Sequence, residues 1–542
     1  MSKKIIIILF LILAIATVLR FYKLGDIPPS PDWDEVALGY DAYSIIHTGR
    51  DEYGKFLPVV LRSFDDYKPA LYAYLSVPSV FFFGLNEFSV RFPSALLGVL
   101  TVFATFFLVK ELFKRNEIAL LASFFLAISP WHIQFSRVGF ESNIGVAFNV
   151  FMALFFIKAF RKPYFLLFSA FFAGLNQYIY QSDRVFTPLL LLALVIIYWK
   201  DLFKISKKYL LTSVILGLIV VLPMIIYIAT DKQALLRVSG TSIFSSQTEL
   251  LKNDIPKLLR DTAKNDKIGL ILDNRRFTFA KIIASNYLSH FNLNWLFITG
   301  DIARHHAPQM GLLYLFELPF LFIGLYIFIF GQYSKKTKLL IIAWFLITPI
   351  PASITTGVPH AVRTLNFLPT FQIFIAIGLI TAIKLLSNIK FWKIFAICYL
   401  LFAIFNFSYY LNQYFVQLNY FNSQEWQYGY KQAVSEVKNI GGNYPKIVVS
   451  DKEPLDKSYM FFLFYLQYPP FEYQKVGQYQ SGGFAAHHNF DKYEFRPIDW
   501  QKDSKAKNVL YIGTPGEFPP DIDALKVIYN KDGTPAIKLV RT

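Results

Sequence analysis

The feature that most constrains this chain is a series of apolar segments, each long enough to form a membrane-crossing helix. A helix needs about 20 apolar residues to span the hydrocarbon core of a bilayer. The segments are residues 5–22, 91–109, 117–135, 142–160, 164–181, 185–199, 209–229, 310–331, 339–355, 365–386 and 391–412. The sequence therefore predicts a polytopic α-helical membrane protein with about 11 transmembrane helices.

The composition excludes several other classes of protein. The hydrophobic fraction of the 542 residues is 54% and the charged fraction is 17%, whereas a soluble domain is about 45–50% apolar and about 25% charged. These values exclude a disordered chain, a fibrous repeat and a coiled coil. The single cysteine, Cys398, excludes an internal disulfide framework and a zinc site built from cysteines.

The basic residues between the segments indicate which side of the membrane each connection faces. With a cytoplasmic N-terminus, the short inner connections hold 18 lysines and arginines, and the short outer turns hold only Arg137, Arg184 and Arg363. This asymmetry follows the positive-inside rule. The net charge of +17 then mainly reflects the basic residues of the inner connections. A nucleic-acid partner is therefore not needed to explain this charge. We expect a multi-pass protein of the plasma (inner) membrane whose first segment is an uncleaved anchor.

Three regions are expected outside the membrane, on its outer face. Residues 23–90 and 230–309 are outer loops of a membrane domain that covers residues 1–412. In the first loop, residues 69–84 contain Pro78, and we expect a helix along the surface or only partly inserted. Residues 413–542 are expected to form a small mixed α/β extracytoplasmic domain. Its predicted elements are strands at 446–449, 509–512, 524–529 and 536–540 and a helix over 453–467.

Carboxylates crowd the first outer loop, whereas the span centres carry almost no charge. Asp34 and Glu35 follow a proline-rich turn. On these residues alone, the loop is a solvated connection in which Asp34 caps a following helix. Charge within the membrane would mark a transport pathway, so its scarcity argues against a transporter or flippase of lipid-linked glycans. That alternative stays open, because prolines such as Pro223 could break the helices.

Several short motifs around these acids resemble one family of membrane enzymes. They are Asp34-Glu35 after the first span, Lys68-Pro69 before a surface helix, Arg91-Phe92-Pro93-Ser94, Ser129-Pro130-Trp131, Ser136-Arg137 and Asp183-Arg184. Together they resemble the GT-C glycosyltransferases, and within these the family 39 group of protein O-mannosyltransferases and aminoarabinose transferases. The resemblance is good over residues 1–200, looser through 310–386, and slight over 413–542.

The resemblance implies an inverting glycosyltransferase. Such an enzyme moves a sugar from a polyprenyl-phosphate carrier to an acceptor hydroxyl of a protein, glycan or glycolipid at the outer face of the membrane. Asp34 matches the general base, and Glu35 would support the acceptor or orient Asp34. Lys68 matches the lysine that contacts the donor phosphate, and Tyr67 could donate a hydrogen bond beside it. The donor sugar stays open among mannose, another hexose and a modified pentose.

Other polar residues at the outer turns are weaker candidates. Arg184, His360 and Arg363 could bind the donor phosphate. The alternative for the two arginines is that their side chains extend from the end of a span toward water. Arg137 and Glu141 are expected to support the acceptor. The family usually has aspartate near the position of Glu141, and the spacing here is shifted.

No metal cofactor is required by these motifs. Related oligosaccharyltransferases hold a divalent ion on outer-loop carboxylates, and Asp34 with Glu141 could do the same. The adjacent pair His305-His306 could also hold a metal, but we predict a surface pair there and again at His487-His488. A further hypothesis is that residues 413–542 recruit a partner.

Overall fold

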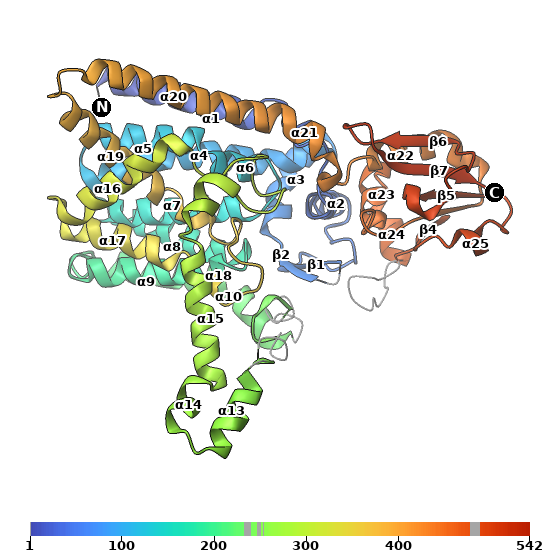
Figure 1. Cartoon of the computed structure of the whole chain (residues 1–542), viewed down its shortest axis with the longest axis horizontal. Helices are drawn as coiled ribbons and strands as arrows, with labels where there is room; N and C mark the ends of the chain where they lie inside the picture. Colours follow the sequence, from blue (N-terminus) through green and yellow to red (C-terminus); the bar gives the residue numbers. More distant parts are fainter. Residues whose placement is uncertain (1, 65, 232–239, 246–250, 253, 477–487) are drawn as a thin grey trace.

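The computed structural model describes every residue except 1, 65, 232–239, 246–250, 253 and 477–487. Most of the described chain is helical, and a helical body occupies one end of the molecule while a sheet lies near the C-terminus at the other (Figure 1). The helices of the body are α1 (Lys3–Phe21), α4 (Glu87–Phe113), α5 (Asn116–Ile128), α6 (Pro130–Ser136), α7 (Ser142–Ala159), α8 (Phe165–Leu175), α9 (Asp183–Leu202), α10 (Lys207–Thr230), α16 (Leu318–Phe330), α17 (Lys335–Ile347), α18 (Ile350–Ser353), α19 (Thr370–Leu386) and α20 (Trp392–Asn412).

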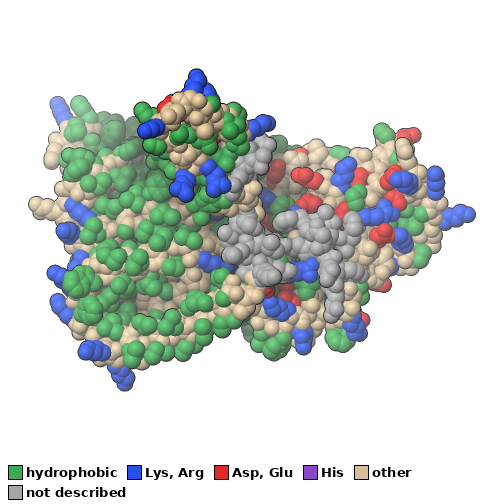
Figure 2. Space-filling view, turned by 90° about the horizontal axis from the view of Figure 1, so that it is seen from below, with side chains coloured by type: hydrophobic (Ala, Val, Ile, Leu, Met, Phe, Trp, Pro, Cys, Tyr) green, Lys and Arg blue, Asp and Glu red, His purple; other side chains and the backbone are tan. Residues whose placement is uncertain are grey.

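Eight helical segments in the described part of the chain are long and apolar enough to cross a membrane. A ninth is present if α5 and α6, which meet at a bend of 58°, form one span. Figure 2 shows hydrophobic side chains over much of the helical body, as expected for a surface that faces lipid. The prediction of a polytopic helical membrane protein is thereby confirmed.

Two of the eleven predicted spans form shorter helices. Within residues 164–181, α8 ends at Leu175 and the chain continues as a 3-10 turn over Asn176–Tyr178. The buried Asn176 side chain donates to the Gly145 carbonyl and the Thr187 hydroxyl. Within residues 310–331, the apolar helix begins only at Leu315. Apolar composition alone does not show where a helix ends, because buried polar side chains and loop geometry set its limits.

Two glycines allow α16 and α19 to pack backbone to backbone. A Cβ added at Gly324 would collide with the carbonyl of Phe374, and one added at Gly378 would collide with the carbonyl of Phe320. Small residues at such crossings are a common basis of helix packing in membranes. Neither obstacle is a flexible side-chain end, so these crossings cannot adjust cheaply to a larger residue.

We expect Gly324→Ala to destabilise the protein by about 1–3 kcal/mol, the usual cost of overpacking a well-packed contact. Thermal unfolding of the purified chain in detergent measures this loss. Gly217→Ala in α10 is the matched control, since its added Cβ would meet Ala170 at an ordinary 3.7 Å. Equal unfolding temperatures for the two variants would contradict the close backbone contact.

The first outer region lies between the helical body and the C-terminal sheet. It consists of α2 (Trp33–Thr48), a hairpin of β1 (Val60–Ser63) and β2 (Asp66–Pro69), and α3 (Leu71–Phe83). The 13-residue α3 contains Pro78 and is shorter than a full span. In the next outer region, α13 (Asp254–Ala263), α14 (Lys267–Leu272) and α15 (Arg275–Ser289) extend away from the body as an arm (Figure 1).

The C-terminal region is a mixed α/β unit, as the sequence predicts. Its five-stranded sheet has the order β4-β3-β5-β7-β6, with β3 parallel to β4 and β5, and β7 antiparallel to β5 and β6. The elements are α21 (Leu418–Phe421), α22 (Tyr430–Ile440), β3 (Lys446–Val449), α23 (Ser458–Leu466), α24 (Pro470–Val476), β4 (Tyr493–Phe495), α25 (Trp500–Asp503), β5 (Val509–Gly513), β6 (Lys526–Tyr529) and β7 (Pro535–Arg541). Strand β4 escapes sequence analysis because it has only three residues.

The C-terminal unit packs directly on the first outer region. The two share one hydrophobic core, which joins α2 and α3 to α23 and the sheet. At Gly39 of α2, an added Cβ would meet Val90 and Phe464. The Gln474 side chain of α24 also donates hydrogen bonds to the hydroxyls of Ser44 and Thr48. The C-terminal unit therefore holds the helix that begins at the acidic motif.

Candidate active site

The acidic motif lies at the first turn of α2, and Asp32 is the residue that caps this helix. Its carboxylate accepts hydrogen bonds from the backbone N–H groups of Asp34 and Glu35, at 2.8 and 3.2 Å. Glu35 accepts in return from the Asp32 N–H, which completes a capping box. The alternative in which Asp34 is the cap is therefore wrong, and the Asp34 side chain is available for other contacts.

Asp34 forms an ion pair with Lys68. The Lys68 Nζ lies 2.9 Å from Asp34 Oδ1, and the exposed fractions of the two side chains are 2% and 32%. Lys68 is held in β2, where it pairs with Leu61 of the antiparallel strand β1. The structure thus brings together the two residues to which the resemblance assigns a role in the reaction, and the Asp34 carboxylate stays partly exposed.

Glu35 is fully buried and is held by Arg91 of α4. The Arg91 Nε and Nη2 donate to the two Glu35 oxygens at 2.8 and 3.0 Å, and the backbone N–H of Gly139 donates to Oε1 at 2.8 Å. Arg91 also donates to the carbonyls of Leu24 and Pro28. Because these bonds fix Glu35 between three chain segments, the geometry favours a positioning role for it.

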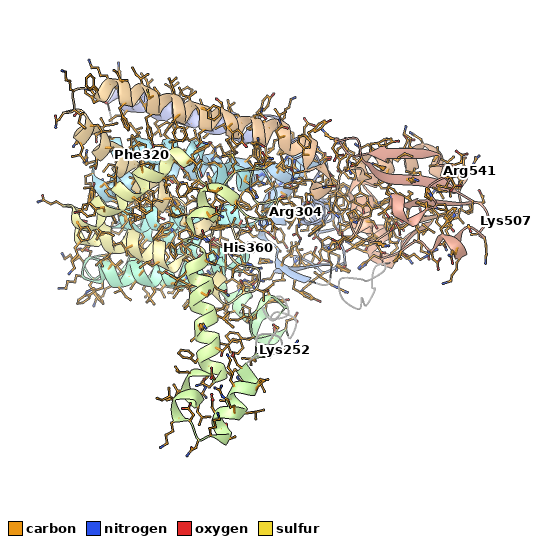
Figure 3. All side chains as sticks on the ribbon, viewed as in Figure 1. Lys252, Arg304, Phe320, His360, Lys507 and Arg541 are labelled. Carbon is orange, nitrogen blue, oxygen red and sulfur yellow. The ribbon has the colours of Figure 1, made fainter. Side chains whose placement is uncertain are left out.

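Two cations that the sequence motifs do not include lie against Trp33, beside Asp34. The Arg304 guanidinium lies 4.1 Å and the Lys457 Nζ 4.0 Å from the centre of the indole ring. Arg304 also pairs with Asp32 at 3.0 Å. Figure 3 labels Arg304 where the helical body meets the outer regions. No motif marks these residues, because they come from the second outer region and the C-terminal unit.

The predicted phosphate-binding residues fall into two groups. Tyr67 packs in a cluster with Met224 and Tyr227 at the end of α10, and Arg184 contacts the Met224 sulfur at 3.3 Å. Tyr67 and Arg184 therefore lie near the same helix end, and Tyr67 precedes Lys68 in β2. His360 and Arg363 belong to a different loop.

In the second group, His360 lies against a buried histidine and Arg363 bonds to its own loop. The Arg363 guanidinium donates to Thr355 and to the Thr356 carbonyl, while the His360 ring lies 5.1 Å from the ring of His305. His305 is only 7% exposed, so the prediction of a surface position for it is wrong. It is buried because Phe135 and Phe140 pack against its ring.

Arg137 and Glu141 are buried at the second outer turn. Arg137 donates hydrogen bonds to the carbonyls of Leu19, Arg20 and Tyr22, which lie at the end of α1. This arrangement closes the last turn of α1. Glu141 immediately precedes α7 and is 7% exposed. A supporting role for either residue toward the acceptor stays a prediction.

The second predicted surface histidine pair also differs from the structure. His488 is 1% exposed and stacks on Tyr459 with ring centres 4.1 Å apart. The surface prediction is therefore wrong for His488, because the aromatic core shared by the C-terminal unit and the first outer region encloses it. His487 lies outside the described residues.

A mainly apolar cavity of about 640 Å³ lies between α8, α9 and α10. Gln177 and Thr187 line it together with aliphatic residues such as Leu191. The carbonyl of Gln177 accepts a hydrogen bond from Arg184 Nε at 3.1 Å. One part of the cavity wall is therefore adjacent to the group formed by Arg184, Met224 and Tyr67.

Comparison with known proteins finds a family model that matches part of the chain and solved structures of similar fold. Residues 67–227, from β2 through most of α10, match the family model described as dolichyl-phosphate-mannose-protein mannosyltransferase. No curated protein matches the chain significantly in sequence.

Solved structures of two other proteins have a similar fold. The chain is similar to ArnT from Cupriavidus metallidurans bound to undecaprenyl phosphate, with a TM-score of 0.55 and 12% identity over 98% of this chain and 97% of that one. It is also similar to the oligosaccharyltransferase AglB from Archaeoglobus fulgidus, in complex with an inhibitory peptide and a dolichol-phosphate. In that case the TM-score is 0.51 and the identity 14%, over 94% of this chain and 69% of AglB. Over residues 67–227 the chain is thus similar to a mannosyltransferase family, and as a whole it has a fold similar to those of ArnT and AglB.

Proposed function

We propose that the chain transfers a sugar from a polyprenyl-phosphate carrier to an acceptor hydroxyl at the outer face of the membrane, with inversion at the anomeric carbon. The observation that carries this proposal is the pair of Asp34 and Lys68. A partly exposed carboxylate and a buried lysine are the two groups needed, one to take a proton and one to bind a phosphate.

The pair also suggests how donor binding prepares the site. Without donor, Lys68 and Asp34 neutralise each other. A bound phosphate competes for Lys68 and releases the Asp34 carboxylate to accept the proton of the acceptor hydroxyl. The acceptor oxygen then bonds to the anomeric carbon as the bond from that carbon to the phosphate oxygen breaks. Lys68 stabilises the negative charge that the leaving phosphate gains.

The cavity between α8, α9 and α10 is suited to the carrier's hydrocarbon chain. Its walls are aliphatic, and Arg184 lies next to Gln177 at its lining. An amphipathic donor would place its chain there and its phosphate toward Tyr67 and Lys68. The ArnT structure bound to undecaprenyl phosphate and the AglB complex with a dolichol-phosphate support a carrier of this class.

The acceptor side is proposed to form around Trp33. Lys457 brings the C-terminal unit to this ring, and Arg304 brings the second outer region. The C-terminal unit would then be a part of the acceptor site and not only a recruiting module. The inhibitory peptide bound to AglB makes a protein hydroxyl a reasonable first acceptor to test, beside glycans and glycolipids.

We expect Lys68→Met to raise the donor KM and lower kcat/KM by about 10–100-fold, because a hydrogen bond to a charged group contributes about 1.5–3 kcal/mol. The assay incubates purified chain with polyprenyl-phosphate mannose, the first donor to test, and a peptide acceptor that carries hydroxyl groups. It quantifies the polyprenyl phosphate released. Lys23→Met removes an exposed lysine of the same outer region and is the control.

Two results would contradict these assignments separately. Unchanged kinetics in Lys68→Met would remove Lys68 from the phosphate site. A wild-type chain that releases no polyprenyl phosphate from any of the hexose and pentose donors would favour the transporter or flippase. Mass spectrometry of the polyprenyl-linked sugars that accumulate in a deletion strain identifies the natural donor sugar.

A further inference from the structure

Three side chains with metal-binding chemistry form a group that includes neither Asp34 nor Lys68. They are Asp301, His305 and His360, and their ligand atoms all lie within 4.8 Å of one another. In the described part of the chain this is the only group of three or more such side chains at that spacing. Asp301 and His305 come from the second outer region, whereas His360 comes from the loop before α19, and Figure 3 labels His360 within the helical body near Arg304.

The distances are close to those of a tetrahedral site. Asp301 Oδ2 lies 3.0 Å from His305 Nδ1, and two ligands of a tetrahedral ion with 2.1 Å bonds are about 3.4 Å apart. The backbone N–H of Ala361 donates to the same Asp301 oxygen at 2.6 Å. This carboxylate is therefore held between both loops, as second-sphere bonds commonly hold a metal ligand.

Burial and neighbouring groups shift the pKa of each of these three side chains. Burial and the charge of Arg363 lower the pKa of His360, and burial lowers the pKa of His305. Burial opposes ionisation of Asp301, but the hydrogen bond from His305 outweighs it, and the pKa of this carboxyl is lowered. Arg304, His306 and His290 also face the group.

One buried atom of the group lacks a partner. The Nδ1 of His360 is inaccessible to solvent and makes no hydrogen bond. Leaving such an atom unpaired costs about 1–3 kcal/mol, and buried polar atoms are rarely left so. A ligand supplied from outside the chain would satisfy it.

We propose that Asp301, His305 and His360 bind a divalent zinc ion. Two imidazoles and one carboxylate are typical zinc ligands, and a water would complete four-coordination. Magnesium and calcium are disfavoured because they prefer oxygen ligands. The ion would join two outer loops that belong to different parts of the chain.

The location of the site indicates that a bound ion would position Arg304 at the start of α2. Arg304 immediately precedes His305 and contacts both Asp32 and Trp33. An ion that fixes His305 therefore also fixes the backbone that carries Arg304 to the start of α2. Metal binding itself does not depend on the proposed transferase activity, so it can be tested separately.

The experiment measures zinc in the purified full-length chain. After chelation and reloading with Zn²⁺ alone, we expect about one zinc per wild-type chain by elemental analysis and a raised unfolding temperature. His360→Ala and Asp301→Asn should each lose most of this zinc. His47→Ala, which removes an exposed histidine of α2, should keep it.

A second measurement covers the case in which a variant fails to fold. Wild-type chain reloaded with Co²⁺ should show the visible bands of a tetrahedral cobalt site, and adding Zn²⁺ should remove them. Wild-type chain that binds no zinc and shows no such bands would overturn the proposal. Zinc bound equally by folded His360→Ala and by wild type would overturn it as well.

Discussion

Replacing Asp34 by asparagine is expected to lower the rate of sugar transfer by about 10²–10⁴-fold, the usual contribution of a general base. The variant keeps the size of the side chain but cannot accept a proton from the acceptor hydroxyl. Asp32 and not Asp34 caps α2, so the helix and its hydrogen bonds should persist. The measurement is transfer from a polyprenyl-phosphate sugar, with unfolding temperature recorded beside it.

Measuring donor affinity distinguishes a role of Asp34 as general base from a purely structural role. In Asp34→Asn the Lys68 ammonium loses its ion pair with the residue 34 carboxylate. The donor phosphate then no longer competes with that carboxylate for Lys68. We expect donor affinity to be equal to that of wild type or higher while turnover is lost. Asp26→Asn alters an exposed acid of the same region and should leave both values unchanged. Transfer at the wild-type rate by Asp34→Asn would exclude Asp34 as the base.

Replacing Arg91 by methionine is expected to be the most damaging change to stability among these variants. It leaves the fully buried Glu35 carboxylate without its counter-charge, and breaking a buried ion pair from one side costs about 3–5 kcal/mol. It also removes the hydrogen bonds to the carbonyls of Leu24, Pro28 and Ser30. We expect a large fall in unfolding temperature, or loss of folded chain from the membrane.

The appropriate control is an exposed ion pair. Lys114 pairs with Glu111 at 2.8 Å, but the Lys114 side chain is 62% exposed. Such pairs contribute about 0–1 kcal/mol, so Lys114→Met should unfold close to wild type. Similar unfolding temperatures for Arg91→Met and Lys114→Met would show that the Glu35–Arg91 pair does not hold the first outer region in place.

The sequence identifies the membrane-spanning helices and the two residues proposed for the reaction, but not their surroundings. Long apolar runs can bury their backbone in a bilayer only as helices, which is why the polytopic fold is predictable. Asp34 and Lys68 are marked by short motifs. Their contact, across 34 residues of sequence, depends on how the β1–β2 hairpin packs against α2.

Burial at the site is not visible in the sequence. Arg91 and Gly139 enclose Glu35, and the predicted role of Glu35 in supporting the acceptor or orienting Asp34 stays a prediction. His305 resembles a surface residue, yet Phe135 and Phe140 cover it. Burial depends on segments far along the chain, and no local pattern of residue types records which segments those are.

The sequence by itself therefore determined the class of protein, the spans and the residues at which to look for chemistry, because hydropathy and short motifs are local properties. Only the tertiary structure decided which acid caps α2 and which stays reachable. It also decided that Arg304 and Lys457 meet at Trp33 and that Asp301, His305 and His360 form one group. These arrangements depend on packing between distant segments, which is a property of the folded chain.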